Sequence, residues 1–210
     1  MPASGRGRFV VLEGGEACGK STQARLLAAH LDAELTHEPG ATAIGAAVRR
    51  LVLDPSTERL DDRAEALLIA ADKAQHVAEI VEPALAAGRD VVCDRYVASA
   101  LAYQGYGRGL DVEQLRAILR FATGGLEPDL TVLLEVPADE ADRRLGRGRD
   151  RLEGLAGDFH DRVRRGFRAL ADTEPDRWVV LSGVAPVDEL AARLRAVVDE
   201  RLGPATAERS

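Results

Sequence analysis

The stretch FVVLEGGEACGKST, Phe9 to Thr22, decides the fold of this 210-residue chain. Its first four residues are apolar and predict a buried strand, while apolar residues just after it recur at helical spacing. Between them lie Gly14, four further residues, and then Gly19, Lys20 and Ser21, which is the spacing of a P-loop. In such a loop, backbone N–H groups and a helix N-terminus surround a phosphate chain. We therefore predict a nucleotide site in which Lys20 reaches the β and γ phosphates and Ser21 binds Mg²⁺.

The alternative interpretation of this stretch is a glycine-rich turn without a ligand. Lysine is rare in this chain, since Lys20 and Lys73 are the only two among many arginines. A turn without a ligand gives no reason for a lysine at this position. The strand, loop and helix around it are also the context that the P-loop requires, so the spacing favours phosphate binding.

Length and composition are those of one globular domain. With 210 residues and 46% hydrophobic content we expect a single domain over residues 1–210, with a frayed tail at 203–210. The net charge of −7 argues against a nucleic-acid or membrane surface as the main partner. No apolar stretch reaches the roughly 20 residues of a membrane span, and no signal peptide is recognised, so we expect a cytoplasmic protein. The two cysteines make neither a disulfide framework nor a zinc site.

Strand and helix patterns alternate along the rest of the chain. Four more strands are predicted at residues 34–36, 90–93, 130–136 and 178–181, and helices at 44–53, 61–87 and from 187 onward. The helix predicted over 61–87 is apolar on more than one face and should be buried on several sides. Five strands that alternate with helices predict the α/β class, with a parallel sheet covered on both faces.

Asp94 and Arg95 directly follow the third predicted strand and should lie at the same sheet edge as the P-loop. A carboxylate at this edge can hold Mg²⁺, and the planar guanidinium of Arg95 suits a second phosphate group. The alternative for this pair is a surface salt bridge. Arg49, on the helix after the loop at 37–42, either binds phosphate or lies on a solvated helix face.

An arginine-rich segment lies between the fourth and fifth predicted strands. Its arginines are Arg143, Arg144, Arg147, Arg149 and Arg151, with Gly146 and Gly148 interleaved. A mobile arginine that closes over a transferring phosphoryl group can supply several powers of ten in rate, and glycines give the backbone freedom to move. We therefore predict a lid at about residues 139–154; the alternative is a solvated charged helix.

Together these segments resemble the thymidylate kinases, a family that transfers a phosphoryl group from ATP to dTMP. The resemblance runs end to end and is most specific in HEPGATAIG from His37 and DRYVASALAYQGYGRG from Asp94, with DRLE from Asp150 in the predicted lid. It implies a P-loop NTPase fold, Mg²⁺ as cofactor, ATP and dTMP as small-molecule partners, dTDP and ADP as products, and a homodimer.

The resemblance also implies a role for each matching position. Implied to bind ATP are Gly14, Gly15, Glu16, Ala17, Cys18, Gly19, Lys20, Ser21 and Thr22. Implied to bind dTMP are Glu16, Glu38, Pro39, Arg49, Ile69, Lys73, Arg95, Ser99, Tyr103 and Gln104. Ser21 and Asp94 would hold the metal, and Lys20 and Arg95 would be catalytic. Because Ala17 stands where some members carry a P-loop arginine, the catalytic arginine is expected in the lid, at Arg151, with Arg147 and Arg149 close behind.

Several positions depart from the family pattern. Ile69 stands where phenylalanine often stacks on thymine, and Lys73 stands where an arginine reads the base. Isoleucine has no π face, and lysine offers one rotatable donor in place of a fixed fork. His37 before EPG and Ala100 are two further differences. These departures leave open a kinase for another or a modified pyrimidine monophosphate.

Two other interpretations concern the P-loop itself. A nucleotide-dependent switch would show an NKxD-type guanine motif or paired acids where Asp94 is followed by Arg95, and the sequence has neither. Cys18 either fills space, as small buried cysteines commonly do, or is a thiolate activated by Lys20 and the helix N-terminus.

Overall fold

The computed structural model describes residues 5–145, 150–155 and 157–203. Within these residues five strands form one parallel sheet in the order β2-β3-β1-β4-β5, which confirms the predicted fold class. The strands are β1 Phe9–Glu13, β2 Glu34–His37, β3 Val91–Asp94, β4 Leu130–Glu135 and β5 Trp178–Ser182. Because β1 is central, the P-loop that follows it meets the carboxyl ends of β3 and β4.

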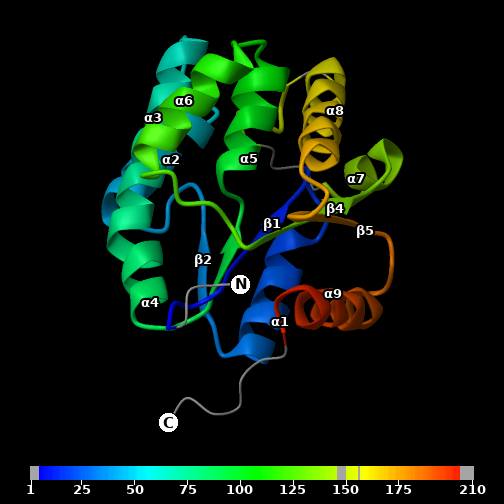
Figure 1. Ribbon diagram of the computed structural model, residues 1–210. Helices are drawn as coiled ribbons and strands as arrows, with labels where there is room; N and C mark the ends of the chain where they lie inside the picture. The colour runs from blue at the N-terminus through cyan, green and yellow to red at the C-terminus, as the bar shows by residue number, and fades with distance from the viewer. Residues whose placement is uncertain (1–4, 146–149, 156, 204–210) are drawn as a thin grey trace.

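Helices cover both faces of the sheet (Figure 1). They are α1 Lys20–Leu31, α2 Ala43–Leu53, α3 Asp62–His76, α4 Glu82–Ala86, α5 Val97–Ala100, α6 Val112–Ala122, α7 Ala138–Arg144, α8 Gly157–Thr173 and α9 Val187–Leu202. Helices α1 and α9 lie side by side on one face, and the other face is covered mainly by α3, α5, α6 and α8. Among the described residues, no helix combines the length and apolarity needed to cross a bilayer.

The structure divides the long helix predicted over residues 61–87. Helix α3 ends at His76, a π-helical turn spans Val77–Val81, and α4 continues from Glu82. Pro83, at the start of α4, has no N–H with which to continue the ladder, and the N–H of Glu82 instead bonds the carbonyl of Val77, five residues back. Helix α4 is followed by Gly88 at φ +76°, a left-handed conformation that suits glycine and ends the helix.

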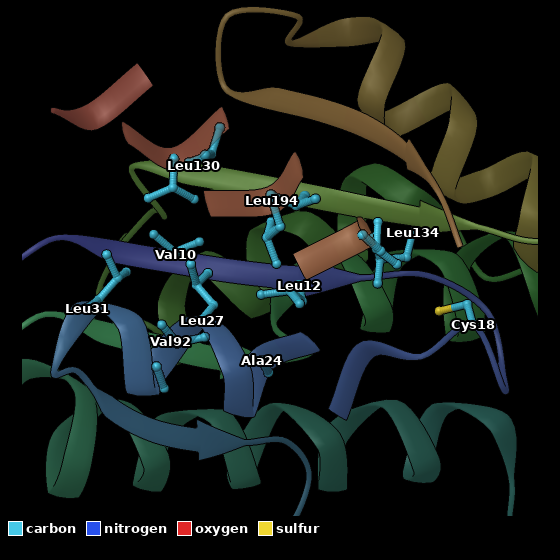
Figure 2. Close-up of a cluster of buried hydrophobic side chains, with 14 residues drawn as sticks. Val10, Leu12, Cys18, Ala24, Leu27, Leu31, Val92, Leu130, Leu134 and Leu194 are labelled. Carbon is cyan, nitrogen blue, oxygen red and sulfur yellow. The ribbon is translucent and has the colours of Figure 1, made fainter. Parts of the chain in front are cut away.

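A buried apolar cluster fixes the P-loop between its strand and its helix. Val10 and Leu12 of β1 pack against Leu27 of α1 and Leu194 of α9, and Cys18 of the loop belongs to the same cluster (Figure 2). Each fully buried leucine contributes about 1.5–3 kcal/mol to the free energy of folding. The loop is therefore anchored at both ends by core packing.

Candidate active site

The P-loop has the backbone that its glycines allow. Gly14 and Gly19 have φ values of +143° and +95°, and a Cβ on Gly14 would lie 2.3 Å from the carbonyl oxygen of Leu134. Lys20 is buried, and its Nζ donates to the carbonyl of Gly15 at 2.6 Å. The ammonium group is therefore held against the loop at the N-terminus of α1. A phosphate chain bound there would contact both a positive charge and backbone N–H groups.

Cys18 is a core residue. Its side chain is 1% exposed and lies in the cluster of Figure 2, with Sγ 3.5 Å from Nζ of Lys20. A thiol without access to solvent cannot be reached by an alkylating reagent while the loop keeps this conformation. The geometry favours the space-filling interpretation.

Ser21, at the N-terminus of α1, and Asp94, the last residue of β3, lie together at the carboxyl edge of the sheet. The Ser21 hydroxyl donates to Oδ2 of Asp94 at 2.5 Å. The other carboxylate oxygen, Oδ1, is buried and has no hydrogen-bond partner among the described residues. A hydroxyl and a carboxylate with a spare oxygen match the hard oxygen ligands that Mg²⁺ prefers, so the two residues fit such an ion.

Arg95 lies at the centre of a second group of predicted site residues. One guanidinium nitrogen, Nη1, donates to the carbonyl of Gly14 and to Oγ of Ser99, both at 3.1 Å. The other, Nη2, donates to Glu16 Oε1 at 2.8 Å and to the Tyr103 hydroxyl at 3.3 Å. The Tyr103 hydroxyl in turn donates to Glu16 at 2.5 Å, and the guanidinium lies 5.1 Å from the Tyr103 ring centroid.

Glu16 stays ionised in this group. Burial raises the pKa of its carboxyl, but the charges of Arg95 and Lys20 and the Tyr103 hydrogen bond outweigh burial and lower the pKa to about 2. Glu16 thus carries a fixed negative charge between the P-loop and Arg95.

Lys73 differs from what the sequence leads us to expect. Its side chain is 2% exposed, and its ammonium group is hydrogen-bonded to the carboxylate of Glu38 and to the carbonyl of Tyr96, the latter at 2.8 Å. His76 Nδ1 lies 2.6 Å from the other oxygen of Glu38. Burial raises the pKa of Glu38, but Lys73 and His76 outweigh it and the pKa is lowered. These two partners use two of the three ammonium N–H groups, and they hold Lys73 in a buried network with Glu38 and His76.

The remaining residues predicted to bind the phosphate acceptor dTMP lie around that network. Arg49 Nη1 donates to the carbonyl of Pro39 at 2.9 Å, and the side-chain amide of Gln104 donates to Glu65 at 3.0 Å. Ile69 is buried on α3.

One cavity of about 650 Å³ connects the P-loop with these residues. Of the predicted site residues it is lined by Glu16, Ala17, Cys18, Gly19, Lys20, Ser21, Thr22, Glu38, Pro39, Arg49, Ile69, Lys73, Asp94, Arg95, Ser99, Tyr103 and Gln104. Such a volume is typical of small-molecule sites. Residues from five separate stretches of sequence thus face one space.

The predicted lid arginines are placed differently from one another. Arg151 does not line the cavity: its Nε donates to the carbonyl of Val52 at 2.7 Å, and its guanidinium pairs with the buried carboxylate of Glu65. Arg147 and Arg149 lie outside the described residues. Arg144 does line the cavity, donating to the carbonyl of Gly183 at 2.9 Å. In this structure Arg151 is therefore paired with the buried carboxylate of Glu65 and lies away from the cavity, and its catalytic role stays a prediction.

Sequence reasoning missed three acidic residues that shape the site. Glu13 is fully buried at the end of β1, and Glu65 holds Arg108 and Arg151 together. Asp72 accepts from the N–H of Gly40 at 3.0 Å, and burial and the charge of Glu38 raise its pKa. Of the three, only Glu13 has a signal in the sequence: it is a charged residue that directly follows the apolar run Phe9 to Leu12.

The comparisons with known proteins agree with this geometry. The family model of thymidylate kinase matches residues 12–194. A thymidylate kinase of Synechococcus sp. (strain JA-2-3B'a(2-13)) is 50% identical over 208 residues, covering 96% of this chain and 98% of that protein. A thymidylate kinase of Desulfovibrio desulfuricans is 46% identical over 208 residues, covering 92% and 96%.

A solved structure gives the same result. The crystal structure of thymidylate kinase from Ehrlichia chaffeensis matches with a TM-score of 0.77 at 28% identity, covering 92% of this chain and 99% of that one. The five-stranded sheet is thus that of the P-loop NTPase fold, and the sequence matches span nearly all of the chain. The chain belongs to the thymidylate kinase family.

Proposed function

We propose that the cavity between the P-loop and Arg95 is where the γ-phosphoryl group of ATP moves to dTMP, giving dTDP and ADP. Family membership supports the reaction. The observation that carries the residue assignment is that two cations from different strand ends, Lys20 and Arg95, line one cavity. Each can hold one of two polyanions, so donor and acceptor phosphates would meet between them.

The chemistry needs no general base. The second pKa of a phosphate monoester is about 6, so the acceptor is mostly a dianion at neutral pH and is itself the nucleophile. Catalysis then rests on aligning two polyanions and stabilising the charge that spreads over the migrating group. Lys20 binds the β and γ phosphates of the donor, and Arg95 orients the acceptor phosphate. Ser21 and Asp94 would hold Mg²⁺, and the bound ion would supply charge neutralisation on the donor phosphates.

Glu16 and Tyr103 orient the acceptor nucleoside in this proposal. Glu16 is ionised and offers an acceptor for the 3′-hydroxyl of the sugar. Tyr103 is held by its bond to Glu16, and we assign its buried ring to the wall beside the sugar, where it would exclude a 2′-hydroxyl. Because Lys73 is already paired with Glu38, we assign the base slot mainly to the shape set by Ile69 and its neighbours.

A coupled assay across acceptor monophosphates tests the proposed function. We expect kcat/KM to be highest for dTMP, lower for dUMP and dCMP, and lowest for UMP, whose 2′-hydroxyl would collide with Tyr103. Since a hydrophobic pocket discriminates one methyl group by only about 10- to 200-fold, the preference over dUMP should lie in that range. A higher kcat/KM for any of the other three would contradict the assignment of dTMP as substrate.

We further propose that the enzyme is a homodimer through α2, α3 and α6. These helices lie side by side (Figure 1), and each exposes large apolar side chains. The exposed residues are Ile44 and Leu51 on α2, Leu67 on α3, and Ile118 and Phe121 on α6. Phe121 is 90% exposed. Large apolar side chains exposed on neighbouring helices are typical of a protein interface.

Replacing Phe121 by glutamate should weaken the dimer. Loss of an aromatic contact at an interface centre costs about 2 kcal/mol or more, so the dimer Kd should rise at least about 30-fold. Sedimentation velocity over a dilution series measures it. Val187→Glu is the matched control, because Val187 is also exposed but starts α9 on the other face of the sheet. Equal sedimentation of the Phe121 variant and the control would exclude this interface.

A cytoplasmic location completes the proposal. Cys18 and Cys93 are both buried free thiols, and unpaired cysteines are typical of reducing compartments, where disulfides are rare. The proposed partners are the two small-molecule substrates.

A further inference from the structure

We propose that Glu13 is a positioning residue that fixes the guanidinium of Arg95 for the acceptor phosphate, acting through Ser99 and the backbone between them. The inference rests on the proposed function, in which Arg95 binds that phosphate. Glu13 itself does not line the cavity. Any effect it has on the acceptor must therefore pass through other residues.

The carboxylate of Glu13 is hydrogen-bonded to the turn that follows β3 and to the first turn of α5. Its Oε1 accepts from the backbone N–H groups of Tyr96 at 2.9 Å and Ser99 at 3.0 Å, and its Oε2 accepts from the Ser99 hydroxyl at 2.6 Å. The side chain is 0% exposed, and burial raises its pKa in spite of these bonds and of the nearby charge of Arg95. Burying a carboxylate costs free energy unless hydrogen-bond donors or cations compensate its charge.

The turn that Glu13 holds is strained at Arg95. Arg95 has φ +74°, in the left-handed region that side chains other than glycine rarely adopt. Such a conformation persists only where the surroundings determine it on both sides. The N–H of Arg95 donates to the carbonyl of Leu12 at 2.9 Å, and the N–H of the next residue, Tyr96, donates to Glu13. Successive residues of β1 thus clamp successive residues of the turn.

Ser99 transmits the position of Glu13 to the guanidinium. A serine hydroxyl has one proton, and here Oγ donates it to Glu13 Oε2. Its lone pairs are then left to accept from Nη1 of Arg95 at 3.1 Å. Two backbone N–H groups donate to Oε1, and while the carboxylate is ionised Oε2 can also only accept, so Glu13 fixes the direction of the bond from Ser99. A glutamine at position 13 can place its NH₂ group toward Ser99. The Ser99 hydroxyl would then accept from that NH₂ group and from Arg95, and its own O–H would have to donate to a different acceptor.

This reasoning gives Glu13→Gln a selective effect. The variant keeps the size of the side chain and an acceptor for the two backbone N–H groups, but removes the fixed acceptor for Ser99. We expect KM for dTMP to rise about tenfold, with KM for ATP changed less than twofold. The inhibition constant of thymidine, which has no phosphate, should also change less than twofold. A structural defect would instead move all three constants, or lower the fraction of active enzyme at unchanged KM.

Ser99 supplies a second pair of variants that does not disturb the strand. Ser99→Ala removes the hydroxyl and should raise KM for dTMP selectively, while Ser99→Thr keeps it and should restore the parental value. If Glu13→Gln does not fold, as judged by thermal unfolding, this pair decides the inference. Unchanged KM for dTMP in both Glu13→Gln and Ser99→Ala would overturn it, as would parallel changes in all three constants.

Arg95→Ala separates the two levels of the proposal. If that variant leaves KM for dTMP unchanged, the assignment of Arg95 to the acceptor phosphate fails. If it raises KM for dTMP while Glu13→Gln and Ser99→Ala do not, only the positioning role of Glu13 fails.

Discussion

Replacing Arg95 by alanine is expected to raise KM for dTMP by about two powers of ten, with a smaller loss in kcat. Hydrogen bonds to charged groups are worth about 1.5–3 kcal/mol each, and the variant would lose the two that a bidentate guanidinium makes with phosphate. We expect about 3 kcal/mol of this loss to appear in dTMP binding, which corresponds to roughly 100-fold in KM. KM for ATP should change little, because the donor phosphates lie against the P-loop. Steady-state kinetics with each substrate varied in turn measures both constants.

The stability of the Arg95 variant needs its own measurement. Arg95 is the direct ion-pair partner of Glu16 at 2.8 Å, and both side chains are mostly buried. Breaking a buried pair by removing one partner typically costs about 3–5 kcal/mol, but Glu16 keeps the Tyr103 hydroxyl and the charge of Lys20. We therefore expect a folded enzyme with a lowered Tm.

Arg95→Lys is the matched control for charge. Lysine keeps the positive charge but not the planar fork, so its KM for dTMP should fall between those of the parent and the alanine variant. A fall in kcat at unchanged KM for dTMP would contradict the acceptor role and place Arg95 on the transferring group instead.

The sheet and the P-loop were predictable because their signals are local. The apolar run at Phe9 to Leu12, the glycines that follow and the helical spacing after Thr22 fix strand, loop and helix without reference to the rest of the chain. Parallel strands bring their carboxyl ends to one edge, so the placement of Asp94 beside Ser21 follows from topology.

The partners of long charged side chains were not predictable in the same way. The resemblance assigns Lys73 and Arg151 to ligands, and each is paired with a glutamate from a distant part of the chain. Lys73 is paired with Glu38 although it also lines the cavity, and Arg151 is paired with Glu65 away from it. The sequence shows which charge is present at a position. It does not show which carboxylate a long, flexible lysine or arginine side chain will contact in the folded protein. Glu13 was missed for the related reason that its donors, Tyr96 and Ser99, lie more than 80 residues later.

The π-helical turn at Val77–Val81 shows a third limit. Pro83 signals that the helix is disturbed, but how the backbone accommodates the missing N–H depends on the packing of Val77 and Val81 against β1 and β3. The proline therefore indicates an interruption of the helix but does not specify its form.

The second large effect concerns Arg151, whose proposed catalytic role requires it to exchange partners. In the structure its guanidinium is paired with Glu65, which is fully buried on α3. Glu65 also accepts from Arg108 Nη2 at 2.8 Å and from Gln104 at 3.0 Å. Its carboxylate would therefore remain compensated if Arg151 turned toward the transferring phosphoryl group. The exchange removes one of three partners of Glu65, so it need not leave a bare buried charge.

Arg151→Ala is accordingly expected to lower kcat by about three powers of ten or more, the effect of removing an arginine that stabilises the transferring phosphoryl group, with KM for both substrates changed much less. The control is Glu65→Gln, which removes the buried charge that Arg151 pairs with but keeps Arg151 itself. Glu65→Gln should lower Tm, while kcat of the folded enzyme stays within about threefold of the parent. The reason is that losing the Glu65 charge weakens a buried ion-pair network but removes no group that contacts the transition state. Rapid-quench measurement of the chemical step separates this effect from product release. If Arg151→Ala matches Glu65→Gln in both Tm and kcat, Arg151 is a structural residue, and the transferring group must be stabilised by another arginine of the lid, of which Arg144 already lines the cavity.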